Sequence, residues 1–169
     1  APTGSYHPLT LASLFFLFSI LGWILETLSY LTMEGVFLNR SILLGPWIPL
    51  YGICGVLSVT MLHRFAKNPI LAFCMNGLLY SVIGYLSDFT VQMIWHADLH
   101  KISQYFRPSL LPPFFADAVF LGLIGCTCQY FIAPKWKQVT RKIPLWFLLC
   151  VCVLLGMLML LDVFFAFYR

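Results

Sequence analysis

The chain has 169 residues, of which 61% are hydrophobic and 9% are charged, and its mean hydropathy is +0.90. Soluble domains carry about 25% charged residues, so this composition excludes an ordinary soluble domain. It predicts an all-α integral membrane protein whose single transmembrane domain covers residues 1–169. The net charge of +4 comes from the connections between apolar segments. No basic face with interleaved aromatic residues is present, so no nucleic-acid partner is expected.

Hydropathy predicts a bundle of about five transmembrane helices, because a span needs about 20 mostly apolar residues. In chain order these spans cover residues 9–33, 43–62, 70–95, 114–133 and 145–168. Prolines stand at nearly every boundary, as expected where helices begin. The first apolar run has no basic segment before it and no small-residue cleavage site after it. It is therefore predicted to be a retained helix rather than a signal peptide.

The distribution of Lys and Arg predicts the orientation of the bundle. The connections 63–69 and 134–144 carry six of them, whereas the other two connections and the C-terminus carry four. Short loops rich in Lys and Arg stay on the cytoplasmic side. We therefore expect a multi-pass protein of a cell membrane, with its N-terminus inside and its C-terminus outside.

Glu26 is the only charged residue between Leu9 and Met33. A carboxylate at that depth costs roughly 2–3 kcal/mol, so an intramembrane acid is by default a candidate functional residue. Arg40 follows in the next connection, and we expect the two to pair. Together with Asn39 and Tyr51 they would form a charge cluster in the outer half of the bundle. A static ion pair that pins the connection and direct contact with a substrate or ion are both open interpretations.

The second span begins unusually, with two prolines and three glycines between residues 45 and 55. The prolines are Pro46 and Pro49. Irregular backbone at membrane depth is tolerated only where protein or a water-filled cavity satisfies its polar groups. Segments interrupted by Gly and Pro also point to binding sites in transporters. An ordinary proline-rich helix start at the interface is the alternative.

The sequence G-W-I-L-E at residues 22–26 is echoed by G-Y-L-S-D at residues 84–88. The echo predicts two parallel repeat hairpins, residues 9–62 and 70–133, followed by a single helix over residues 145–168. In each motif the glycine, the aromatic ring and the acid share a helix face. The glycine should therefore admit a neighbouring helix, and the acid should point into that contact. The rings are Trp23 and Tyr85, and the second acid is Asp88.

Other polar residues give weaker signals. Asp117 lies near a helix start and Asp162 near the C-terminus, and both are predicted to be structural. His96 and His100 are spaced to share a divalent metal on a helix, but no third ligand is evident. The six cysteines lie in apolar segments and are expected to be packing thiols. No metal and no cofactor are therefore expected.

Motifs of several enzyme classes do not occur. The sequence has no G-x-x-x-x-G-K-[ST], no G-x-S-x-G, no H-E-x-x-H and no C-x-x-C. The chain therefore has no P-loop ATPase of its own and is not expected to be an enzyme.

Residues 16–55 contain G-W-x-x-E, then N-R, then G-P-x-x-P-x-Y-G, about 40 residues in all. This combination resembles the CmpB-like family of bacterial membrane proteins labelled ABC-transporter type IV. Ser41 stands where the family has glycine. Asp88 and W-H-A-D at residues 95–98 stand where it has a second glutamate and W-D-Y-S.

The resemblance implies a permease that works with a separate ATPase. The expected function is therefore a membrane component, permease-like or an accessory subunit, of a transporter for a small or amphipathic substrate. Its expected partners are the lipid bilayer and a separate ATPase or membrane subunit. A non-transporting membrane scaffold is the alternative. A third possibility is an intramembrane enzyme that uses Glu26 and Asp88 as acid and base.

Overall fold

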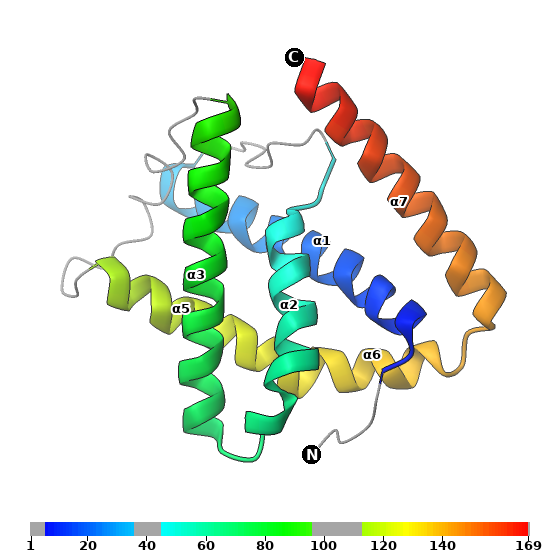
Figure 1. Cartoon of the computed structure of the whole chain (residues 1–169), viewed down its shortest axis with the longest axis horizontal. Coiled ribbons are helices and arrows are strands. Elements are labelled where there is room, and N and C mark those ends of the chain that lie inside the picture. Colours follow the sequence, from blue (N-terminus) through cyan, green and yellow to red (C-terminus); the bar gives the residue numbers. More distant parts are fainter. Residues whose placement is uncertain (1–5, 36–44, 96–112, 169) are drawn as a thin grey trace.

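A computed structural model describes residues 6–35, 45–95 and 113–168, and within these ranges all regular structure is helical (Figure 1). A few side chains near helix ends, including those of Asp88 and Asp117, lie outside the description. The α-helices are α1 (Pro8–Glu34), α2 (Pro49–Met61), α3 (Pro69–Trp95), α5 (Pro113–Thr127), α6 (Ala133–Thr140) and α7 (Leu145–Tyr168). A 3₁₀ turn, η1 (Leu62–Phe65), follows α2, and a π-helical turn, η3 (Cys128–Ile132), joins α5 to α6.

Three of these helices are long and apolar enough to cross a membrane. The qualifying segments are Pro8–Leu28 in α1, Pro69–Leu86 in α3 and Leu145–Ala166 in α7. This agrees with the expected class of all-α membrane protein. The count of five spans and the orientation of the termini remain predictions.

The predicted start of the second span at residue 43 is wrong as a helix boundary, because α2 begins at Pro49. Residues 45–48 are not helical. Proline suits the first position of a helix, since it has no N–H to satisfy and its φ is already helical. The 13 residues of α2 extend only about 20 Å at 1.5 Å per residue. The helix is therefore shorter than the hydrocarbon core of a bilayer, which is about 30 Å thick.

The fourth span is predicted to end at residue 133, whereas helical structure continues beyond it through η3 and α6 to Thr140. The connection expected over residues 134–144 is thus mostly helical. Proline within an α-helix normally clashes with the carbonyl one turn earlier. Pro134 lies two residues after the end of the wide π turn of η3, and π-bulges are sites where a helix bends and readjusts its bonding. The helix can therefore pass through this proline.

Among the described helices, α1 packs chiefly on α2 and α3 on α5, and α7 lies against α1 (Figure 1). Glycines allow the first of these contacts. The α-carbons of Gly52 and Gly55 face Phe15 and Phe18 of α1, with no room for a larger side chain. Pairing of successive helices is what two hairpins require, while the relation of the hairpins as repeats remains a prediction.

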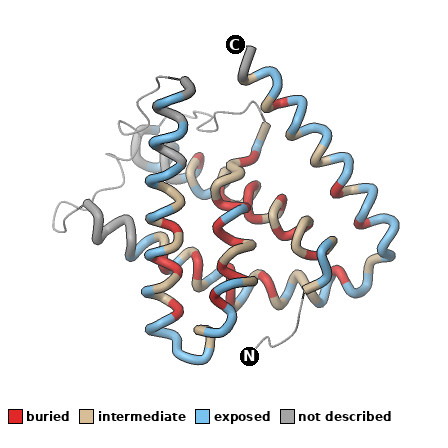
Figure 2. The backbone as a smooth tube through the Cα atoms, in the orientation of Figure 1, coloured by how far each residue is buried: buried red, intermediate tan, exposed pale blue. Residues whose placement is uncertain are grey.

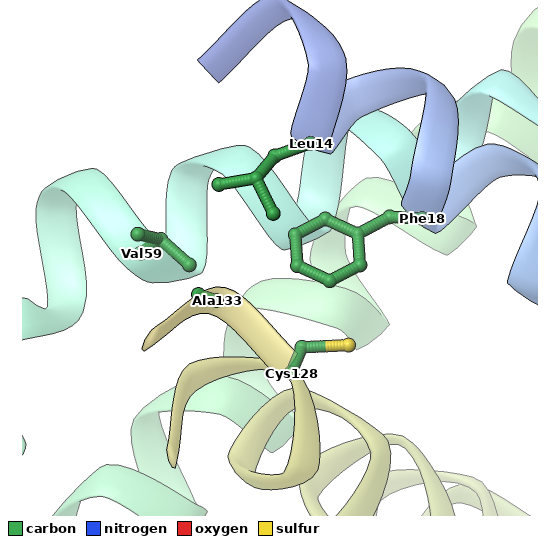
Figure 3. Packing of buried hydrophobic residues seen from close by; sticks show 5 residues of the cluster. All are labelled: Leu14, Phe18, Val59, Cys128 and Ala133. Carbon is green, nitrogen blue, oxygen red and sulfur yellow. The ribbon is translucent and has the colours of Figure 1, made fainter. Parts of the chain in front are cut away.

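The apolar core lies where α1, α2 and the α5–η3–α6 rod meet (Figure 3). Its buried members are Leu14, Phe18, Val59, Cys128 and Ala133. The outer side chains of α3 and α7 are mostly exposed and apolar (Figure 2). An exposed apolar surface of this extent suits a protein surrounded by lipid.

A polar network crosses this interior between α2, α3 and η3. The Ser58 hydroxyl donates to Oδ1 of Asn76. Nδ2 of Asn76 donates to Oε1 of Gln129 at 2.9 Å, and Nε2 of Gln129 donates to the Leu62 carbonyl at 3.0 Å. Asn76 and Ser58 are fully buried. These bonds satisfy buried polar groups and also cap a carbonyl at the end of α2.

Candidate functional site

Glu26 lies on α1, and its carboxylate is bound by a residue of α2. The Tyr51 hydroxyl donates to Oε1 of Glu26 at 2.9 Å. Gly22, one turn before Glu26, lies directly under the Tyr51 ring, because a Cβ at Gly22 would come within 2.6 Å of the Cβ of Tyr51. The glycine and the acid of the first motif therefore act together: one makes room for the tyrosine and the other accepts its hydrogen bond.

A second carboxylate, that of Asp162 on α7, reaches the same segment from the other end of the chain. Its Oδ2 accepts the backbone N–H of Gly45 at 2.7 Å and the indole N–H of Trp47 at 3.0 Å. Asp162 is only 7% exposed and Trp47 is also buried. Hydrogen bonds to an ionised acceptor are shorter and stronger than those between neutral groups. Asp162 therefore holds the residues that precede α2.

The stretch from Gly45 to Ile48 is also hydrogen-bonded to α1. The Ile48 N–H donates to the Ser19 carbonyl at 3.0 Å, and the Trp47 N–H donates to the Gly45 carbonyl at 2.9 Å. The backbone N–H groups of this non-helical stretch are thus bound by protein groups, as irregular backbone at membrane depth would require. An irregular turn therefore precedes a helix that starts at Pro49, and the choice between the two sequence interpretations of this segment remains a prediction. We call residues 45–51 the interrupted segment.

The structure places the other predicted site residues less centrally. Trp23 is half-buried on α1, and Pro46 is exposed within the interrupted segment. Tyr85 is 74% exposed on α3, so its ring does not join the buried residues around Glu26. A Cβ at Gly84 would meet no described atom within 4 Å. The expectation that each motif glycine admits a neighbouring helix is therefore met at Gly22 but not, among described atoms, at Gly84.

The remaining predicted residues cannot be placed in the site. The backbone of Asp88 lies in α3, but its side chain is outside the description. Asn39, Arg40, His96 and His100 lie outside the described residues. The pairing of Glu26 with Arg40 thus remains a prediction.

The family described as "Putative ABC-transporter type IV" matches residues 13–167, nearly the whole chain. The chain belongs to this family. The match confirms the resemblance seen in residues 16–55 and extends it over both carboxylates and the interrupted segment. Neither a curated protein nor a solved structure matches the chain.

In this ABC-transporter-related membrane protein, two acids and their hydrogen-bond donors lie at one site. Two carboxylates from its first and last long helices bind one short segment through a phenol, an indole N–H and a backbone N–H. No group of three or more potential metal ligands occurs in the described part of the chain. The site can therefore present negative charge beside aromatic rings, or hold the segment fixed.

Sequence reasoning interpreted Asp162 as structural and missed its connection to the interrupted segment. A signal for it exists. Asp162 is the only charged residue between Leu145 and Tyr168, the same property that singled out Glu26. The partner could not be read from the sequence, because Gly45 lies 117 residues away.

Proposed function

We propose that the chain is the membrane component, permease-like or an accessory subunit, of a transporter that relies on a separate ATPase and handles a small or amphipathic substrate. The observation that carries this proposal is the convergence of Glu26 and Asp162 on the interrupted segment. Acids inside membrane segments are costly and commonly mark substrate or ion pathways. Segments interrupted by Gly and Pro commonly form the binding sites of transporters.

The geometry suggests how a substrate would act on this site. A substrate group with positive charge or hydrogen-bond donors would compete with Tyr51 and Trp47 for the carboxylate oxygens. The faces of the two aromatic rings would favour the same kind of group. Binding would thus loosen the interrupted segment from α1 or α7. Arg40, if it pairs with Glu26 as predicted, would belong to the same cluster.

We place the protein in a cell membrane with five spans, its N-terminus inside and its C-terminus outside. In Figure 1 the starts of α1 and α3, the end of α2 and helix α6 lie toward one end of the molecule. The start of α2 and the ends of α3 and α7 lie toward the opposite end. The connections 63–69 and 134–144, rich in Lys and Arg, belong to the first end.

A non-transporting scaffold is the second candidate, and one observation favours it. Hydrogen bonds of Glu26 and Asp162 go to groups of the protein itself, namely the Tyr51 hydroxyl, the Gly45 N–H and the Trp47 indole N–H. Such bonds could serve only to orient α1, α2 and α7. An ATPase partner distinguishes the two candidates.

The test is purification of the tagged full-length chain from membranes of its native host in a mild detergent. We expect an ATP-hydrolysing polypeptide to co-purify, and vanadate-sensitive ATP hydrolysis to co-elute with the chain. A stable complex that contains no nucleotide-hydrolysing subunit would favour the scaffold and contradict the proposal.

The substitution Glu26→Gln tests the role of the carboxylate within that complex. Glutamine keeps an oxygen that can accept the hydrogen bond from Tyr51, but it removes the negative charge. A hydrogen bond from a substrate group to the charged carboxylate would contribute about 1.5–3 kcal/mol. If Glu26 contacts substrate, ATP-dependent activity falls by about tenfold or more, while the thermal midpoint stays near that of the wild type. If the role is static, Glu26→Gln folds less well than Glu26→Gln/Arg40→Gln, since the single change strands a charge.

A further inference from the structure

Two segments of the chain form an exposed basic surface that the proposed site does not use. One is η1 with the turn after it, and the other is α6 with the turn after it. Six exposed Lys, Arg and His side chains lie on them, and we call them the basic face: His63, Arg64, Lys67, Lys135, Arg141 and Lys142. The sequence contains no Asp or Glu in residues 35–87 or 118–161. The positive charge is therefore not balanced by acids on these segments.

Hydrogen bonds bring the two segments to one end of the molecule. Nε2 of Gln129 donates to the Leu62 carbonyl, and the Tyr130 hydroxyl donates to the Ala66 carbonyl at 2.8 Å. Both donors lie in η3, and α6 follows directly. Figure 1 shows the end of α2, the start of α3 and α6 at the same end of the molecule. Both halves of the basic face therefore lie at the same end of the molecule.

Contacts with α1 fix which side of α6 faces outward. The indole N–H of Trp136 donates to the Ser13 hydroxyl at 2.8 Å. Nζ of Lys137 lies 4.6 Å from the centre of the Tyr6 ring. Burial raises the pKa of the Tyr6 hydroxyl, so the ring beneath the lysine stays uncharged at neutral pH. Lys135 therefore projects from the free side of α6, together with Gln138 and Val139.

Each half of the basic face is followed at once by an exposed apolar helix turn. After Lys67, Ile70 in the first turn of α3 is 80% exposed. After Lys142, Trp146 in the first turn of α7 is 67% exposed. Basic side chains at headgroup level above apolar and aromatic side chains are the pattern of a membrane–water boundary. A soluble acidic protein would match the charge but not the apolar surface that continues along α3 and α7.

We propose that the basic face binds the headgroups of anionic phospholipids, of the phosphatidylglycerol class. The phosphates would meet the Lys and Arg side chains, and the acyl chains would cover the exposed first turns of α3 and α7. This binding is separate from the site around Glu26 and Asp162, and it does not depend on a transport function.

The test measures thermal unfolding of the full-length chain in uncharged dodecyl maltoside micelles. Dioleoylphosphatidylglycerol is expected to raise the midpoint more than dioleoylphosphatidylcholine at equal concentration, because a ligand that binds the folded state stabilises it. The difference should shrink in 0.5 M NaCl, since salt screens exposed charges. Equal shifts with both lipids would overturn the proposal, and this comparison needs no variant.

A triple variant locates the effect. Lys135→Gln/Arg141→Gln/Lys142→Gln should leave the midpoint without lipid unchanged and raise by about tenfold or more the phosphatidylglycerol concentration that gives half of the shift. The control Lys101→Gln/Arg107→Gln/Arg169→Gln removes the same charge from other parts of the sequence and should keep the wild-type response. An equal loss in the control would overturn the proposal, as would an equal shift with soluble glycerol 3-phosphate.

Discussion

Replacing Gly52 by alanine should destabilise the protein by about 1–3 kcal/mol, the usual cost of overpacking a close contact. A Cβ at this position would lie against the Ser19 hydroxyl and 2.6 Å from the Phe15 carbonyl oxygen. A side chain can rotate away, but a backbone carbonyl of α1 can move only if α1 and α2 separate. The loss should therefore appear in the free energy of unfolding, measured by titration of mixed micelles with sodium dodecyl sulfate.

Gly84→Ala is the matched control for this prediction. Gly84 lies in α3, and a Cβ there would meet no described atom within 4 Å. Alanine in a helix is favoured over glycine by roughly 0.5–1 kcal/mol, so this variant should be as stable as the wild type or slightly more so. If the two alanine variants lose the same stability, the close approach of α1 and α2 at Gly52 is wrong.

Asn76→Leu should cost about 1–3 kcal/mol for each polar group that it leaves buried without a partner. The Ser58 hydroxyl loses its acceptor, and the Gln129 carbonyl oxygen loses its donor. Leucine also presses on Gly125, whose α-carbon faces the Asn76 side chain closely. The same unfolding titration measures the loss, with a thermal midpoint as a second measurement.

Tyr80→Phe is the control for Asn76, since Tyr80 lies one turn further along α3 and is equally buried. In the described part of the chain its hydroxyl has no nitrogen or oxygen partner, and only the Cys128 thiol, a weak hydrogen-bonding group, lies beside it. Removing an unsatisfied buried hydroxyl should leave the stability unchanged or raise it. A variant Asn76→Leu as stable as Tyr80→Phe would show that the network contributes nothing.

Helix positions were predicted well where hydropathy and proline agree. The expected segments 70–95 and 145–168 fall within one residue of α3 and α7, and 9–33 falls within one residue of α1. The first helix ends as its sequence suggests, at Gly35 with φ of +68°, a conformation that favours glycine. The helix boundaries differ from the predicted ones at two places. Apolar residues precede Pro49, which starts α2, and a π turn lets the helix continue through Pro134.

The candidate site was only half predictable. Glu26 and Tyr51 could be grouped because G-W-x-x-E and G-P-x-x-P-x-Y are close in the sequence. The bonds from Asp162 to Gly45 and Trp47 join residues more than 100 positions apart. Local sequence patterns cannot predict a contact over such a separation. The network of Asn76 and Gln129 was missed because uncharged amides lower the hydropathy of a span only slightly, although each must find a partner when buried.

The central claim is that acids from α1 and α7 hold the interrupted segment in place. A double-mutant cycle across Asp162 and Trp47 tests it most directly. The free energy of unfolding is measured for the wild type, Asp162→Asn, Trp47→Phe and the double variant, because such a cycle isolates the pairwise interaction. A coupling energy of about 1–2 kcal/mol is expected for this charged, buried hydrogen bond. Effects that simply add, with no coupling, would show that the bond between Asp162 and the Trp47 indole does not help to hold the segment, which would contradict the claim for α7.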